Sequence, residues 1–236
     1  INFLSGDAVS TTALDLDGGI LWQTKVTDYL EHQGYGSSPA LHGDLVIVSA
    51  DNKGPAGGAV CGLDRRTATV KWRHPRAALP NYASPVVLEV AGKTQLFLTG
   101  LEKVTSLDPL TGRVNWEIAG ATTECVTTTP TDGQRIYSSG GYPKNHVAAI
   151  AADGTGKVVW ERVAREEAPH EAAQGENGTW ASASAATDGQ HIIASFESRG
   201  IYCYDMSGTL VWQKDLGDKK MRNEFGEGST PAHIVG

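Results

Sequence analysis

The sequence predicts an all-β fold assembled from a repeated unit of four antiparallel strands. Five similar phrases, each ending in a tryptophan, recur along the 236 residues. The tryptophans are separated by 50, 44, 44 and 52 residues, and a period of this size is typical of repeat architectures. Only the short segment 162–173 shows a trace of helical periodicity. Four-stranded sheets that repeat at this period and are arranged radially describe a β-propeller.

The repeated phrase predicts a hairpin whose second strand carries the tryptophan. Its copies lie at 14–24, 63–73, 107–117, 152–162 and 204–214, and the third reads LDPLTGRVNWE. Aspartate followed by Thr-Gly is turn chemistry, because the carboxylate bonds to nearby backbone N–H groups and glycine accepts a positive φ. The second copy has Ala68 in place of the glycine, and the fourth shifts its aspartate to Asp153. We therefore expect these two turns to be strained or differently shaped.

An apolar residue precedes each tryptophan by two positions. Side chains two apart on a strand share a face, so we expect each pair to be buried together. The five pairs are Ile20 and Trp22, Val70 and Trp72, Val114 and Trp116, Val158 and Trp160, and Leu210 and Trp212.

A second phrase between the tryptophans, such as GSSPALHGDLVIVSA at 36–50, predicts the inner strands of each unit. A proline marks the same point of the period four times, at Pro39, Pro85, Pro130 and Pro231, and Ala186 stands where another would be. The unit is therefore four strands over about 45 residues. We expect one propeller domain over 1–236 with five blade-equivalents, at 1–25 plus 228–236, 36–77, 82–118, 126–163 and 180–214.

The two ends of the chain carry complementary parts of a blade. Residues 1–25 supply three strands without an inner one, and 228–236 has the form of an inner strand. Pairing within the chain would remove both exposed sheet edges, so we favour a closed monomer. Exchange of the terminal strand between copies, which gives a homo-oligomer, and a longer natural protein are the alternatives.

The combination Asp-x-x-Thr-Gly-x-x-x-Trp followed by Ser-Ser-Pro-x-x-x-Gly-Asp resembles the bacterial quinoprotein-type, or PQQ-like, propeller repeat. That family includes quinoprotein alcohol dehydrogenases, the propeller lipoprotein of outer-membrane protein assembly and many secreted repeat proteins. The resemblance implies a periplasmic or secreted location and seven or eight blades, from which five is a departure. It also implies a structural role for the repeat tryptophans, each docked against the neighbouring blade: Trp22, Trp72, Trp116, Trp160 and Trp212.

The composition argues against several classes of partner. The formal net charge is −7 with acids and bases interspersed, which is a poor match to nucleic acid. No apolar run approaches the roughly 18 residues that a membrane span needs. Cys61, Cys125 and Cys203 are odd in number and lie in strand-like runs, so we expect buried free thiols.

Binding residues are expected on one face of the disc. In a propeller of this strand order, the links between blades share a face with the links between second and third strands, and loops converge there. A small-molecule or protein ligand would meet these polar and aromatic side chains first. The candidates are Glu31, His32, Tyr35, Glu124, Tyr142, Lys144, Asn145, His146, His170, Glu171, Trp180, Arg222 and Glu227.

Three histidines of that face, His32, His146 and His170, come from different blades and suggest a divalent metal site. Neutral imidazole beside a carboxylate suits zinc, which generates hydroxide for hydrolysis. Family members that bind PQQ use an adjacent-cysteine disulfide, a tryptophan and calcium ligands. This sequence has no adjacent cysteines, so PQQ is not expected. We predict a binding or interaction scaffold, with a metal-assisted hydrolase as the alternative and a quinoprotein oxidoreductase third.

Overall fold

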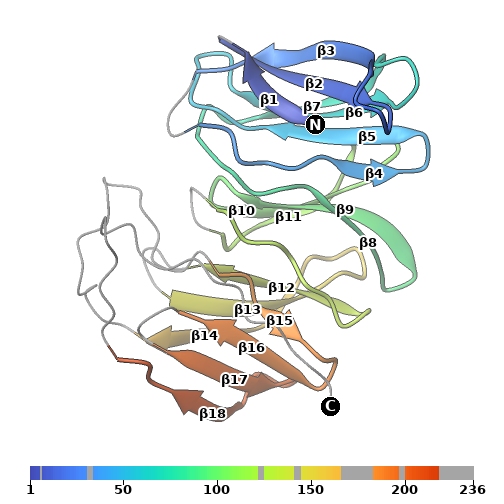
Figure 1. Ribbon diagram of the computed structural model, residues 1–236. Coiled ribbons are helices and arrows are strands. Elements are labelled where there is room, and N and C mark those ends of the chain that lie inside the picture. Colours follow the sequence, from blue (N-terminus) through green and yellow to red (C-terminus); the bar gives the residue numbers. More distant parts are fainter. Residues whose placement is uncertain are drawn as a thin grey trace.

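Five antiparallel sheets follow one another in chain order, and the first and last lie at opposite ends of the row (Figure 1). This computed structural model describes residues 1–5, 7–30, 34–121, 125–140, 145–165, 183–196 and 200–217. Each strand pairs only with its neighbours in sequence, and every pairing is antiparallel. We call the sheets blades 1 to 5. The predicted all-β architecture of repeated antiparallel sheets is confirmed.

The strands of the blades are as follows. Blade 1 comprises β1 (Asn2–Ser5), β2 (Ala8–Leu14) and β3 (Ile20–Asp28). Blade 2 comprises β4 (Ala40–His42), β5 (Leu45–Ala50), β6 (Gly58–Asp64) and β7 (Val70–Arg76). Blade 3 comprises β8 (Val86–Val90), β9 (Lys93–Gly100), β10 (Lys103–Leu107) and β11 (Val114–Ala119). Blade 4 comprises β12 (Arg135–Gly140), β13 (Asn145–Ala151) and β14 (Val158–Arg165). Blade 5 comprises β15 (Ala186–Thr187), β16 (His191–Ser195), β17 (Ile201–Asp205) and β18 (Leu210–Lys214).

Two blades have three strands among the described residues. Blade 1 has the three strands predicted for it, and its proposed fourth, 228–236, lies outside the described residues. In blade 4 the expected inner strand is reduced to one bridge between Thr131 and Ile136. The segment 162–173, which carried a trace of helical periodicity, begins as the end of β14.

The aspartate turns form as predicted. In blade 3, Asp108 Oδ1 accepts hydrogen bonds from the backbone N–H groups of Leu110 at 2.8 Å and Thr111 at 3.1 Å. Gly112 ends this turn with a φ of 68°, and Ala68 takes a φ of 62° in the corresponding turn of blade 2. A residue with a Cβ rarely adopts that conformation, which confirms the expected strain at Ala68.

The turn of blade 4 is differently shaped, as the displaced aspartate predicted. The backbone N–H of Ala151 donates to the carbonyl of Lys157, whereas that of Asp108 donates to Arg113. Ala151 thus takes the position of the aspartate, and the turn is one residue longer. Asp153 Oδ1 accepts instead from the backbone N–H of Thr155 at 2.9 Å.

The pairing of β10 with β11 corrects the expected burial of the apolar residue before each tryptophan. Trp116 pairs with Ser106 and Val114 with Leu107, so Asn115 is an extra residue in a β-bulge. Ser106 and Leu107 are consecutive and face opposite sides, and their partners therefore do too. Val114 is 48% exposed, whereas Trp116 is 6% exposed. The register shifts at the equivalent point in the other four blades.

The tryptophans reach the turn of the next blade. Trp22, Trp72 and Trp160 donate their indole N–H groups to backbone carbonyls of Arg65, Pro109 and Met206, at 2.8, 3.1 and 3.1 Å. The rings cover the turn glycines, because a Cβ at Gly156 would lie 2.6 Å from Cε3 of Trp116. Side chains of consecutive blades therefore pack into shared apolar clusters, one of which joins Trp72 to Leu107.

Trp116 and Trp212 depart from this pattern. Among the described residues, the buried Nε1 of Trp116 has no hydrogen-bond partner; it faces the altered turn of blade 4. Trp212 in the last blade is 44% exposed. At the other end of the row, a Cβ at Gly18 in the turn of blade 1 would meet no atom within 4 Å.

The three cysteines are buried and form no disulfide, as expected. Burial is the largest influence on Cys61 and Cys203 and raises the pKa of both thiols. Such thiols are poor nucleophiles at neutral pH. Among the described residues, no helix has the length and apolarity to cross a membrane.

The turn aspartates predict how stability depends on acid. Hydrogen bonds from the backbone of Arg66 and then Thr67 lower the pKa of Asp64 to about 2 from its ordinary value of 3.8. Because the folded pKa is the lower one, this stabilisation is present above pH 3.8 and is lost as the pH falls toward 2. We expect Asp64→Asn to lower the melting temperature at pH 7 and the difference from the wild type to shrink at pH 2.

Thermal unfolding followed by circular dichroism at pH 7, 4 and 2 measures this difference. Asp17→Asn, in the exposed turn of blade 1, is the control and should leave the curve unchanged at each pH. An Asp64→Asn deficit of equal size at pH 2 and pH 7 would contradict the assignment.

Candidate functional site

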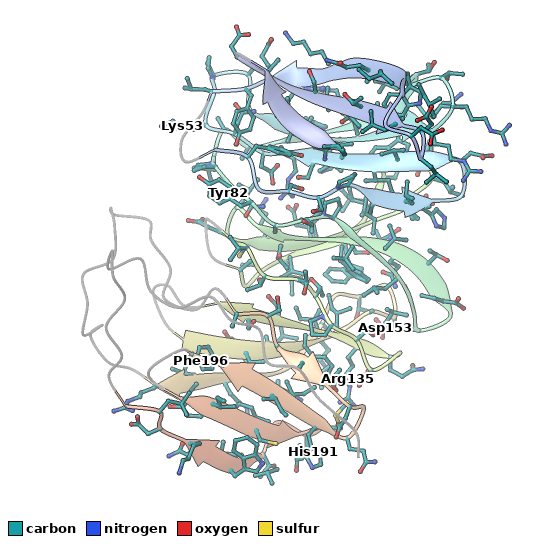
Figure 2. All side chains as sticks on the ribbon, viewed as in Figure 1. Lys53, Tyr82, Arg135, Asp153, His191 and Phe196 are labelled. Atoms are coloured by element: carbon teal, nitrogen blue, oxygen red, sulfur yellow. The ribbon has the colours of Figure 1, made fainter. Side chains whose placement is uncertain are left out.

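The blades present two different edges. The loop edge carries the links between blades and the links between second and third strands, and the turn edge carries the tight hairpins. Figure 2 shows Lys53 and Tyr82 on one side of the row and Asp153 on the other. Lys53 follows β5, Tyr82 follows β7, and Asp153 lies in the turn between β13 and β14. The predicted binding face is the loop edge.

Most of the predicted site residues lie outside the described residues. Asn145 and His146 start β13 and are therefore not part of the link before it; their backbones pair with β12 and β14. The three-histidine metal site therefore stays a prediction. No group of three or more His, Cys, Asp or Glu side chains suited to a metal occurs in the part of the chain that the structure describes. The predicted site residues that lie outside the described part of the chain are Glu31, His32, Glu124, Tyr142, Lys144, His170, Glu171, Trp180, Arg222 and Glu227.

Tyr35 is the predicted site residue whose side chain is described. Its hydroxyl donates to the backbone carbonyl of Ser49 at 2.5 Å and accepts from Asn2 Nδ2 at 3.1 Å. Its ring meets Tyr29 edge-on with centroids 6.0 Å apart. Burial raises the pKa of the phenol, so the hydroxyl keeps its proton at neutral pH. These contacts connect blades 1 and 2.

A buried ion pair of the loop edge, Asp51 and Arg76, forms together with its hydrogen-bond partners Asn81 and Thr105 what we call the polar clasp. Arg76 Nε donates to Asp51 Oδ1 at 3.0 Å and its NH2 group to Oδ2 at 3.2 Å. The two side chains are 3% and 1% exposed. Asn81 Nδ2 adds a third bond to this carboxylate at 3.0 Å. Three donors therefore fix the position of this buried carboxylate.

The clasp joins blades 2 and 3 to the link that leads to blade 4. Asp51 follows β5 in blade 2, and Asn81 lies on the link to blade 3. The amide of Asn81 also donates to the carbonyl of Thr99 at 2.9 Å and accepts from the backbone N–H of Cys125 at 2.8 Å. Gly100 makes room for it, because a Cβ there would collide with the amide. The clasp therefore holds the loop edge of blades 2 and 3, and the start of the link to blade 4, in one arrangement.

The candidates expected from the sequence did not include Arg76, although one signal was present. Trp72, His74 and Arg76 alternate along β7, and a face that buries a tryptophan also buries the residues two and four positions on. A buried arginine needs a carboxylate partner. That partner, Asp51, is 25 positions away, and no local pattern identifies it.

A second feature lies on the turn edge, between blades 3 and 4. It is a cleft of about 490 Å³. Its lining contains one ammonium group, one carboxylate, two amides and a hydroxyl, and no aromatic or branched aliphatic side chain. The residues are Lys93, Thr94, Gln95, Asp108, Asn115 and Gly154.

Comparison with known proteins agrees with the repeat pattern. A PQQ-type family model described as outer membrane protein assembly factor BamB matches residues 3–142. No curated protein sequence matches the chain. Similar folds occur in BamB from Moraxella catarrhalis, with a TM-score of 0.62, 17% identity and coverage of 92% of this chain and 63% of that one. Quinohemoprotein alcohol dehydrogenase from Comamonas testosteroni has a TM-score of 0.62 at 15% identity, covering 90% and 41%.

Quinohemoprotein alcohol dehydrogenase ADHIIG from Pseudomonas putida HK5 is similar as well, with a TM-score of 0.60 at 16% identity and coverage of 91% and 41%. This chain therefore spans less than two thirds of the length of each of these structures. At such identities the likeness concerns the fold, and it carries no cofactor or reaction to this chain.

Proposed function

We propose that this chain, which belongs to the PQQ-like repeat family described as outer membrane protein assembly factor BamB, is a scaffold that binds a protein partner through its loop edge. The family match is the observation that carries the proposal. Its description names a protein that takes part in assembly, and the matched residues 3–142 include the described strands of blades 1 to 3 except for Asn2, the first residue of β1.

The polar clasp supports the choice of the loop edge. A surface held in one conformation before binding loses less conformational entropy when a partner arrives. The links that begin at the clasp carry exposed side chains, which include Lys53, Pro55 and Ala78. At the turn edge, indoles of Trp22, Trp72 and Trp160 bind the turns of the next blade and so serve the stacking of the propeller.

The cellular location follows from the same proposal, whereas the oligomeric state does not. A partner in outer-membrane assembly places the protein in the periplasm or another secreted compartment of a bacterium. A monomer closed by its own terminal strand, or a homo-oligomer formed by exchange of that strand, stays a prediction because 228–236 lies outside the described residues. The metal-assisted hydrolase and the quinoprotein oxidoreductase gain no supporting contact among the described residues.

A photo-crosslinking amino acid placed at Pro55 or Ala78 tests the proposal in the producing cells. Both positions are exposed on the loop edge, and exposed Leu110 and Arg66 on the turn edge are matched controls. We expect discrete adducts with another protein from the loop positions and none from the controls. Mass spectrometry identifies the adduct. Equal adducts from both edges, or none from the loop edge, would argue against the scaffold.

A further inference from the structure

The inner hairpin of blade 3 departs from the repeat. In blades 2 to 4 the residue after the repeat proline pairs across this hairpin, so the number of residues between it and its partner measures the hairpin's length. Its two ends are Ala40 and Ile47 in blade 2, Val86 and Phe97 in blade 3, and Thr131 and Ile136 in blade 4. The hairpin of blade 3 is thus four residues longer than that of blade 2. Residues that a repeat does not need for stacking are candidates for a specific role.

The extended hairpin is held against blade 4. Ala91 and Gly92 form its tip, both with positive φ, and the tip projects toward blade 4 (Figure 1). The backbone N–H of Ala91 donates to the carbonyl of Gly133 at 2.8 Å. Gln95 Nε2 donates to the carbonyl of Ala152 at 2.6 Å. Two attachments on one neighbour make the hairpin a fixed wall of the cleft.

The floor of the cleft is a chain of side-chain hydrogen bonds. Asn115 Nδ2 donates to Ser106 Oγ at 3.1 Å, and Ser106 Oγ donates to Gln95 Oε1 at 2.8 Å. Gln95 is 1% exposed, and its amide nitrogen is already bonded to backbone carbonyls. The β-bulge at Asn115 therefore has a second consequence, since the extra residue brings an exposed amide to the rim of the cleft.

Two opposite charges stand at the rim. A Cβ on Gly154 would lie 3.6 Å from Lys93 Nζ, so the ammonium lies over the turn of blade 4. Asp108 is held by backbone bonds to its Oδ1. Within the described residues, neither Lys93 nor Asp108 forms an ion pair with another side chain. Hydrogen bonds from Thr155 lower the pKa of Asp153, and the charge of Lys93 lowers it to a smaller extent.

We propose that this cleft binds a small zwitterion of the amino acid or short peptide class. The ligand carboxylate pairs with Lys93 and its ammonium with Asp108, while Thr94 and Asn115 supply hydrogen bonds. The lining disfavours other classes. An apolar ligand would strip water from both charges without pairing them, and a ligand with a single charge would leave one of them unpaired. No aromatic side chain lines the cleft for a base or a sugar to stack on.

Amide chemical shifts of the ¹⁵N-labelled protein test the proposal with glycine, diglycine and triglycine as probes. The three lengths cover different separations between ammonium and carboxylate. We expect saturable shifts at Lys93, Thr94, Asn115 and Gly154 with at least one of them. Acetylation of its amine or amidation of its carboxylate should each raise the Kd at least tenfold.

Two variants separate the cleft from nonspecific binding. Lys93→Gln removes the ammonium group and disrupts no ion pair among the described residues. We expect this variant to raise the Kd at least tenfold. Lys214→Gln, on β18 two blades away, should leave the Kd unchanged. The proposal is wrong if no zwitterion gives saturable shifts at the cleft. It is equally wrong if a peptide that is both acetylated and amidated binds as tightly as the zwitterion. The same holds if the Lys93→Gln variant binds the zwitterion with an unchanged Kd.

Discussion

Replacing Trp116 by alanine is expected to lower the free energy of unfolding by about 3–5 kcal/mol, because the ring is buried between two blades and its loss leaves a cavity. Trp116 is 6% exposed, lies 6.0 Å from Phe97 between ring centroids and covers Gly156 in the next blade. Chemical denaturation measures the change. The β-bulge neighbour is the control: Asn115→Ala loses the bond to Ser106 and should cost about 0.5–1.5 kcal/mol.

The hydrogen bonding of the indoles sharpens this test. Trp116 Nε1 has no partner among the described residues, whereas Trp72 Nε1 donates to Pro109. Phenylalanine keeps most of the apolar ring and removes the N–H group. Trp116→Phe should therefore cost less than Trp72→Phe, which leaves a buried carbonyl unpaired. The reverse order, or a larger cost for Asn115→Ala than for Trp116→Ala, would show that the blade contacts are assigned wrongly.

Arg76→Met should lower the free energy of unfolding by about 3–5 kcal/mol, because it leaves the carboxylate of Asp51 buried without its cation. Asp51→Leu should lower it by a similar amount, because it leaves the guanidinium of Arg76 buried without its anion. The double variant replaces both charges by apolar groups and should cost less than the sum of the two. Equilibrium denaturation of the four proteins gives the coupling energy directly.

An exposed ion pair in blade 3 is the control for the buried pair of the clasp. Lys103 Nζ lies 2.6 Å from Glu117 Oε1, and the two side chains are 51% and 34% exposed. Pairs of this kind contribute about 0–1 kcal/mol, so Lys103→Met should have a small effect. Strict additivity of Arg76→Met and Asp51→Leu would mean that their contact does not hold the loop edge.

Much of the fold could be predicted because its signals are local. The aspartate turns and the altered turn around Asp153 depend on residues a few positions apart, and the tryptophan period repeats one such local phrase five times. The strained conformation at Ala68 was visible as a missing glycine. The face of Val114 was predicted wrongly, since strict alternation holds only where no residue is inserted, and the bulge at Asn115 inserts one.

The candidate site was less accessible to the same reasoning. Strand order located a face on which links converge, and Tyr35 on that face proved to be a contact between blades. Neither the clasp nor the cleft was foreseen. Asp51 and Arg76 carry no motif, and the length of the β8–β9 hairpin becomes meaningful only when it is compared with its counterparts in the structure.

Composition, period and turn chemistry were therefore sufficient for the fold class, the repeat, the five hairpins and the state of the three cysteines, because each of these depends on a segment and its near neighbours. The packing of one blade on the next settled the remainder. Gln95 meets Ala152 across 57 positions, and Asn81 meets Cys125 across 44. Such contacts exist only once the blades have stacked, since their geometry is set by sheet twist and interface packing rather than by the order of residues within either partner.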